Sequence, residues 1–128
     1  MKKYLVDTDI FIDFFKKKPW AKKVFAARSH EIYFSSVTLK ELLRGAQSGA
    51  DEKRILKFLH FHTELRITSE IGEKSLMLLR KYPRLKRSDS LIAACAIVKR
   101  LPLVTRNLKD FSSIKELKVI DGKSFEGE

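Results

Sequence analysis

The chain has 128 residues, the usual size of one domain, and 44% of them are apolar, which is enough for one hydrophobic core. Its 27 lysines and arginines exceed its 16 acidic residues by 11, so the charge favours nucleic acid as a partner, ahead of an acidic membrane surface. No apolar run reaches the ~18 residues of a membrane span, and Asp7, Asp9 and Asp13 interrupt the first apolar stretch, which argues against a signal peptide. Cys95 is the only cysteine, so the chain cannot form an internal disulfide. With neither a disulfide nor a signal peptide, we expect a cytoplasmic protein, with one domain over residues 1–128.

The first half of the chain alternates between apolar runs typical of strands and apolar stripes typical of helices. Asp7 and Thr8 are expected to cap the first helix, and Asp51 the fourth, while Thr38 and Glu41 match a capping box. The expected elements are a strand at 4–6, a helix with Ile10, Phe11, Phe14 and Phe15 on one face that ends in a basic turn at 16–19, a short helix at 21–27, a strand at 31–35, a helix with the stripe Leu39, Leu42, Leu43 and Ala46, and a helix with Ile55, Leu56, Phe58 and Leu59.

The second half continues the same alternation and ends in residues 122–128, where fraying is expected. Ser88 or Asp89 is expected to cap a helix after a basic loop at 82–87. Strands that alternate with helices predict an α/β domain with a mainly parallel central sheet flanked by helices. The expected elements are a short strand or connector at 65–67, a helix from Ser69 to about Arg80, a helix with Leu91, Ile92, Cys95 and Val98 buried, a strand at 103–105 and a last strand at 119–120.

Acidic residues follow several of the predicted strands. Asp7 comes directly after the first strand, Glu41 and Asp110 lie just beyond later ones, and Asp89 opens a helix. In an open parallel sheet, the ligand crevice lies outside the carboxyl ends of the strands, so these acids are expected to converge there. Clustered carboxylates repel one another unless a cation neutralises them, which predicts a site for Mg²⁺ or Mn²⁺. Taken singly, Asp7, Glu41 and Asp89 also have a structural interpretation as helix caps.

Four short segments around these acids resemble the signatures of the PIN-domain nucleases. The first signature is an apolar strand that ends in Asp-Thr followed by Asn or Asp, and the segment YLVDTDIFID resembles it. The second is Ser or Thr before a helix with a Glu-Leu pair, and the segment SSVTLKELLRGA is similar to it. The third signature is Asp before an Ile-Ala-Ala helix, and the fourth is a strand that ends in Val-Thr and is followed by Asn and Asp-Phe. The segment RSDSLIAACAIVKRLPLVTRNLKDF resembles both in turn. The resemblance runs from Lys3 to about Phe111, and the small size suits the VapC-type toxins of that family.

This resemblance implies a single PIN-like domain with a metal site at Asp7, Glu41 and Asp89. It implies a less regular fourth ligand at Asp110. Asp9 stands where Asn is common, which departs slightly from the family pattern, and we expect it to be either an outer-shell ligand or a solvent-facing cap. The supporting residues that the resemblance implies are Thr8, which would orient the first aspartate through a hydrogen bond, Thr105 and Asn107.

The resemblance also implies an endoribonuclease that hydrolyses RNA phosphodiester bonds with a bound Mg²⁺ or Mn²⁺, together with a cognate antitoxin and a homodimer. Such chemistry needs no histidine base, and His30, His60 and His62 lie beside no matching motif. Tyr82 or Trp20 is a candidate for stacking on a splayed base. The two apolar stripes of the first half are candidates for dimer or antitoxin contacts, or for ordinary core. The basic residues expected to contact RNA are Arg84, Lys86, Arg87, Arg106 and Lys109, with Lys81 nearby.

Two other functions remain as alternatives. Asp7 and Asp9 after an apolar strand also fit the first motif of the haloacid-dehalogenase-type phosphatases, with Asp7 as the nucleophile and Asp9 as the acid/base. That interpretation requires a downstream acidic pair, commonly in a Gly-Asp context that this chain lacks, and it gives Glu41 no role. A non-catalytic nucleic-acid-binding module would fit the charge, but acids that face phosphate would weaken its binding unless a metal were present.

Overall fold

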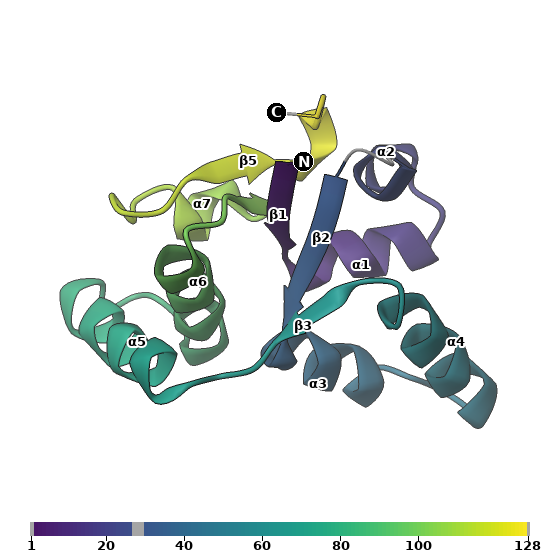
Figure 1. Ribbon diagram of the computed structural model, residues 1–128, viewed down its shortest axis with the longest axis horizontal. Coiled ribbons are helices and arrows are strands. Elements are labelled where there is room, and N and C mark those ends of the chain that lie inside the picture. Colours follow the sequence, from purple (N-terminus) through teal and green to yellow (C-terminus); the bar gives the residue numbers. More distant parts are fainter. Residues whose placement is uncertain (1, 27–29, 128) are drawn as a thin grey trace.

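Five parallel strands form the central sheet in the computed structural model, which describes residues 2–26 and 30–127. The strand order β3-β2-β1-β4-β5 places β1 in the middle, and the chain switches from one side of β1 to the other before β4 (Figure 1). All four strand pairs are parallel, so the carboxyl ends share one edge. The predicted mainly parallel sheet is confirmed. The strands are β1 Lys2–Val6, β2 His30–Ser35, β3 Thr63–Leu65, β4 Leu103–Thr105 and β5 Val119–Asp121.

Helices lie on both sides of this sheet (Figure 1). Side chains alternate along each strand, so Tyr4 and Val6 pack into one core cluster while Leu5 packs into the other. Within the described residues, none of the helices is long and apolar enough to cross a bilayer. On the side of the first cluster lie α1 Thr8–Phe15, α2 Pro19–Ala26, α3 Ser36–Arg44 and α4 Gly49–Leu59, together with a short 3₁₀ turn at Gly122–Ser124 that contacts α2. On the other side lie α5 Ser69–Lys81, α6 Arg87–Lys99 and α7 Leu108–Phe111.

The predicted N-caps of α3 and α4 are wrong. Helix α3 begins at Ser36 with Ser35 as its N-cap, whose hydroxyl accepts a hydrogen bond from the Val37 N–H, so no capping box forms at Thr38. Helix α4 begins at Gly49 with Ser48 as its N-cap, and Asp51 lies inside its first turn. In both cases a serine closer to the end of the preceding segment caps the helix, because a short hydroxyl reaches the free backbone N–H groups of the first turn.

Helix α6 also differs from the prediction. It begins at Arg87, so Asp89 lies in its first turn and neither Ser88 nor Asp89 is the cap. The predicted amphipathic stripe is wrong in part: Leu91 and Val98 are only half-buried, whereas the small side chains between them face the core. Small residues let α6 lie close to both the sheet and α5, which explains why it is buried on most sides. The buried residues of α6 are Ser90, Ile92, Ala93, Ala94, Cys95 and Ala96.

The chain after β5 is packed rather than frayed up to residue 127. Phe125 is only 3% exposed, and its ring makes edge contacts with Tyr4 and His30. An added Cβ at Gly122 would lie 2.3 Å from Cδ1 of Ile10, so a larger residue there would require the Ile10 side chain to shift. Other elements differ as well: β3 shares only Leu65 with the predicted 65–67 segment, and α7 was not predicted. Helix α2 begins at Pro19, before the predicted start at 21, and residue 27, its predicted end, lies outside the described residues.

Candidate active site

Asp7 lies at the centre of the carboxyl edge of the sheet, where β1 and β4 meet. Its backbone N–H donates to the carbonyl oxygen of Val104 at 2.9 Å, which extends the pairing of the two strands. Its Oδ1 accepts from the Thr8 N–H at 2.8 Å, and its Oδ2 accepts from the Thr105 hydroxyl at 2.7 Å. Asp7 is therefore both the N-cap of α1 and a fixed carboxylate at the point where the strand order reverses, the usual place for a ligand in such sheets.

Glu41 is brought to this edge by a pair of buried threonines. The Thr8 hydroxyl donates to Glu41 Oε1 at 2.6 Å and lies 2.9 Å from the Thr38 hydroxyl. Since a hydroxyl has one proton, Thr38 must donate to Thr8 while Thr8 donates to Glu41. The sequence prediction that Thr8 orients Asp7 is correct for its backbone N–H, but its side chain positions Glu41 instead.

Asp89 and Asp110 occupy the neighbouring part of the edge. Asp89 lies in the first turn of α6 and is half-buried, and burial, followed by the charges of Asp110 and Glu41, raises its pKa. Asp110 lies in α7, and its Oδ2 accepts from Nδ2 of Asn107 at 2.8 Å. The Asn107 N–H in turn donates to the Thr105 hydroxyl at 3.0 Å. The structure thus brings all four predicted acids into one electrostatically coupled group.

Asp9 faces the same edge and adds to its negative charge. Burial, and then the charge of Asp9, raises the pKa of Asp7 from 3.8 to about 7. Burial likewise raises the pKa of Asp9. Carboxylates in a poorly solvated group favour a proton or a cation, because either one removes the repulsion between them.

Arg106, predicted as an RNA contact, is instead bound to an acid of α1. Its Nε and Nη2 donate to the two oxygens of Asp13 at 2.8 and 3.2 Å, and its backbone N–H donates to Asp9 Oδ2 at 3.2 Å. Trp20 Nε1 also donates to Asp13, at 2.9 Å. Burial alone would raise the pKa of Asp13, but the hydrogen bonds from Arg106 and Trp20 outweigh it and lower that pKa.

Asp13 and Trp20 were not among the predicted site partners of Arg106. Helical spacing could have predicted that Asp13 belongs to the site, because Asp13 follows Asp9 by one turn of α1 and lies on the same side of that helix. A buried carboxylate is stable only when paired, so an acid on the core side of a helix predicts a cationic partner.

The donor set fits a hard divalent cation. Carboxylate oxygens are the ligands that Mg²⁺ and Mn²⁺ prefer, and Asp9 Oδ1 is buried without a hydrogen-bond partner. Across residues 2–26 and 30–127, no three Asp, Glu, His or Cys side chains form a group that would hold one ion together. The acids therefore match a metal site in chemistry and charge, and they are not arranged as a closed metal cage.

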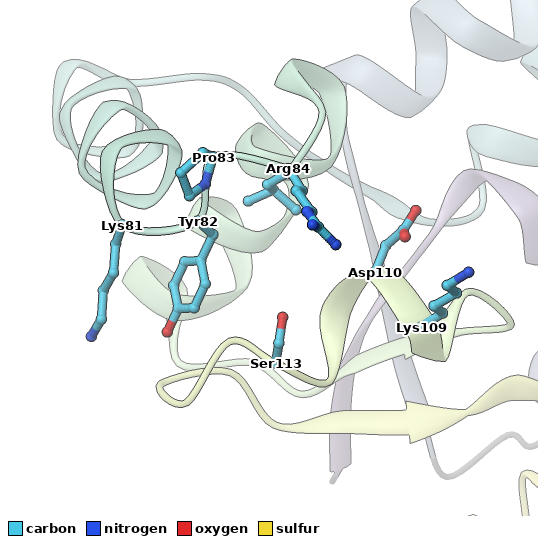
Figure 2. A pocket seen from close by; sticks show the side chains of 8 residues that line it. Lys81, Tyr82, Pro83, Arg84, Lys109, Asp110 and Ser113 are labelled. Atoms are coloured by element: carbon cyan, nitrogen blue, oxygen red, sulfur yellow. The ribbon is translucent and has the colours of Figure 1, made fainter.

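Three of the five predicted RNA contacts lie near Asp89 and Asp110. Arg84 and Lys109 line a hollow of about 460 Å³ that Asp110 also lines, and the Arg84 guanidinium extends toward the Asp110 carboxylate (Figure 2). Lys86 is close enough to Asp89 for its charge to act on that carboxylate. The fourth residue, Arg87, is the first residue of α6. Arg84, Lys86 and Lys109 therefore lie beside the acids on the α6 side of the edge.

Known proteins resemble this chain over nearly its whole length. The PIN-domain family matches residues 4–117. Ribonuclease VapC1 of Methanocaldococcus jannaschii is 33% identical over 93% of this chain and 88% of the relative, and the tRNA(fMet)-specific endonuclease VapC of Salmonella typhimurium is 30% identical over 94% and 98%. A toxin–antitoxin complex from Klebsiella pneumoniae contains a chain with a TM-score of 0.83 and 34% identity, covering 93% of this chain and 97% of that one.

These matches decide between the families considered from the sequence. The similarity covers the segments that hold Asp7, Glu41 and Asp89, and it extends over both core clusters. It gives no support to the dehalogenase-type phosphatase interpretation of Asp7 and Asp9. The chain belongs to the PIN-domain family.

Proposed function

We propose that this chain is a divalent-metal-dependent endoribonuclease that hydrolyses RNA phosphodiester bonds and acts as the toxin of a VapBC-type toxin–antitoxin pair. The observation that carries the proposal is a group of carboxylates at the carboxyl edge of a parallel sheet, in a chain with a net charge of +11. Relatives named as a ribonuclease and an endonuclease support the same activity.

Asp7, Glu41, Asp89 and Asp110 would hold Mg²⁺ or Mn²⁺, with Asp9 as an outer member. When bound, such an ion lowers the pKa of a coordinated water and polarises the phosphate. The chain itself orients the ligands through hydrogen bonds: both oxygens of Asp7 accept one, Glu41 accepts from a threonine, and Asp110 accepts from an asparagine. Fixed ligands reduce the reorganisation that binding and reaction require.

The RNA strand would be bound by the basic side chains on the α6 side of the site. We assign phosphate contacts to Arg84, Lys86, Arg87 and Lys109. Arg106 is excluded from this set, because its guanidinium is already bound to Asp13.

The antitoxin and a second copy of the chain are the proposed protein partners. Ile10, Phe11 and Leu42 belong to the core and do not contribute to such contacts, because each is at most 4% exposed. The remaining members of the two predicted stripes are partly exposed and stay candidates: Phe14, Phe15, Leu39, Leu43 and Ala46. A toxin–antitoxin complex among the similar solved structures supports an antitoxin partner for this chain.

A cleavage assay tests this function directly. Wild type is incubated with mixed RNA in Mg²⁺, in Mn²⁺ or in EDTA, beside Asp89→Asn and the charge-matched control Glu73→Gln. Glu73 is exposed on α5, and its side chain makes no hydrogen bond or ion pair with the described residues. We expect wild type and the control to cleave RNA only with a cation, and Asp89→Asn to lose about 100-fold or more, since ligand loss removes several kcal/mol of stabilisation.

Circular dichroism establishes that Asp89→Asn is folded. Cleavage that persists in EDTA, or cleavage by Asp89→Asn at the wild-type rate, would reject the metal–carboxylate mechanism. RNA binding without cleavage under every condition would favour the non-catalytic nucleic-acid-binding module.

A further inference from the structure

A hollow of about 460 Å³ opens beside Asp110, between the end of α5 and α7 (Figure 2). Residues 81–85, Lys109, Asp110 and Ser113 line it, and we call it the α5–α6 pocket. We propose that this pocket binds one unpaired nucleotide of the RNA strand, next to the phosphate that is cleaved. The inference rests on the proposed ribonuclease function, and it assigns a binding place to the part of the RNA strand that extends beyond the carboxylates. Pockets of about 300–1,000 Å³ are the usual size for a small organic ligand.

The position of the pocket links it to the carboxylates. Asp110 lines the pocket, and its charge acts on Asp89. The hydrogen bond from Asn107 keeps the Asp110 carboxylate at the border between the two regions. A strand with one phosphate at the carboxylates therefore places an adjacent nucleotide at the pocket.

The charge of the pocket suits a phosphodiester strand. Arg84 and Lys109 are exposed, and neither has a hydrogen bond or ion pair within the part of the chain that the structure describes. Asp110 is the only acid among the lining residues, and Figure 2 shows the Arg84 guanidinium directed toward it. Unpaired cations beside the cleavage site are available to bind phosphate, whereas the Arg106 guanidinium is already occupied.

Tyr82 supplies an aromatic wall for a base. Its hydroxyl accepts a hydrogen bond from the Lys115 N–H at 3.3 Å, which holds the ring, and the Lys81 ammonium lies 5.7 Å from the ring centroid. A ring at the wall of a cationic hollow stacks on any unpaired base, because every base has a π-face. Bases within a duplex are already stacked, so the pocket selects a single-stranded segment.

Trp20, the other aromatic predicted to stack, is already occupied. Its Nε1 donates to Asp13, and the ammonium groups of Lys18 and Lys123 lie 5.7 and 5.2 Å from its ring. Trp20 therefore supports the α1 side of the site rather than a base.

The hollow next to Glu41 fits RNA less well. It measures about 270 Å³, and both Glu41 and Asp51 line it together with several apolar side chains. Its Arg54 is paired with Asp51 at 3.6 Å, so among the described residues Lys16 is the one cation of that wall whose side chain makes no hydrogen bond or ion pair. The α5–α6 pocket thus offers more unpaired positive charge and less negative charge.

Binding measured without cleavage tests the inference. Fluorescence anisotropy in EDTA gives the Kd of a short labelled single-stranded RNA, and of the same sequence in a duplex, for wild type and variants. We expect Tyr82→Leu to raise the single-strand Kd about tenfold, and Tyr82→Phe to change it little, because phenylalanine keeps the ring. We expect no effect of Tyr82→Leu on duplex binding.

Arg84→Ala provides a second and independent variant. Loss of one phosphate contact should lower the slope of log Kd against log salt by about 0.7 on single-stranded RNA. The control is Lys99→Ala, which removes one charge at the far end of α6 and should leave the slope unchanged.

The outcomes separate this inference from the proposed function. If wild type cleaves RNA, but Tyr82→Leu and Arg84→Ala bind the single strand as wild type does, the pocket assignment is wrong and the function stands. If the variants weaken single-strand binding as expected but wild type never cleaves, the pocket assignment stands and the function is wrong. Equal weakening of single-strand and duplex binding by Tyr82→Leu would also overturn the pocket assignment.

Discussion

Arg106 and Arg84 flank the same group of carboxylates, yet their surroundings differ. Arg106 follows β4 and is bound through its guanidinium to Asp13, a carboxylate whose side chain is 6% exposed. Arg84 lies in the loop between α5 and α6, is exposed, and has no bonded partner in the described chain. One arginine therefore belongs to the frame of the site, and the other is free to bind a substrate.

The same difference extends to the acids on the two sides. On the α1 side, the charge of Asp13 is neutralised by Arg106 and both oxygens of Asp7 accept hydrogen bonds. On the α6 side, Asp89 is half-buried with an unfavourable charge from Asp110. We infer that the α1 side keeps the ligands in place, while the α6 side remains open to ion and RNA. The two arginines have the same side chain, so residue type does not reveal which one is structural. The hydrogen bonds and ion pairs that each side chain makes do reveal it.

The largest expected effect on stability comes from removing the charge of Asp7. Its pKa is raised from 3.8 to about 7 in the folded state only, so the folded protein binds more protons than the unfolded chain between these values. The free energy of unfolding without divalent cation therefore falls as the pH rises from about 4 to about 7. Asp7→Asn should be the more stable protein above that range, by roughly 1–4 kcal/mol.

Urea unfolding across this pH range, in EDTA, measures the difference between Asp7→Asn and wild type. Glu73→Gln serves as the control, since it removes one exposed carboxylate of α5. Parallel pH profiles for wild type and Asp7→Asn would show that burial of Asp7 does not cost folding energy, and would remove the electrostatic argument for a cation at this edge.

A smaller effect should separate the two arginines. Arg106→Ala leaves Asp13 buried with only the Trp20 hydrogen bond, and we expect it to lower the free energy of unfolding by about 1–3 kcal/mol. The lower end applies because the Arg106 side chain is 41% exposed. Arg84→Ala should change it by less than about 0.5 kcal/mol. Thermal and urea unfolding of both variants measure the difference. Equal destabilisation by Arg106→Ala and Arg84→Ala would show that the two arginines do not differ in their contribution to the folded structure.

The sequence predicted those parts of the site that depend on local pattern. Asp7 and Thr105 could be placed at one edge because each lies at the end of a short apolar run, and parallel strands end at the same edge. The expectation that Asp89 joins them rested mainly on the resemblance to the family, because Asp89 opens a helix and nothing in its local pattern separates a first-turn acid from a cap. The alternation of strands and helices was sufficient for the α/β class.

What could not be predicted depends on contacts between distant segments. Arg106 meets Asp13 across 93 positions of chain, and only the adjacency of β1 and β4 brings them together. Phe125 was assigned to a frayed end because its partner Tyr4 lies at the start of the chain. The cap at Ser35 was missed because several hydroxyls near that helix start were equally suitable by sequence.

The central claim is that the carboxylates of this edge hold a divalent cation, and calorimetric titration with Mn²⁺ tests it most directly. Just below pH 7, Asp7 is partly protonated, so binding must displace its proton, and the measured heat must depend on the ionisation enthalpy of the buffer. We predict that wild type binds Mn²⁺ with proton release, and that Asp7→Asn and Asp89→Asn bind it at least about tenfold more weakly. Mn²⁺ binding by both variants with the affinity of wild type, or no binding by wild type, would contradict this account.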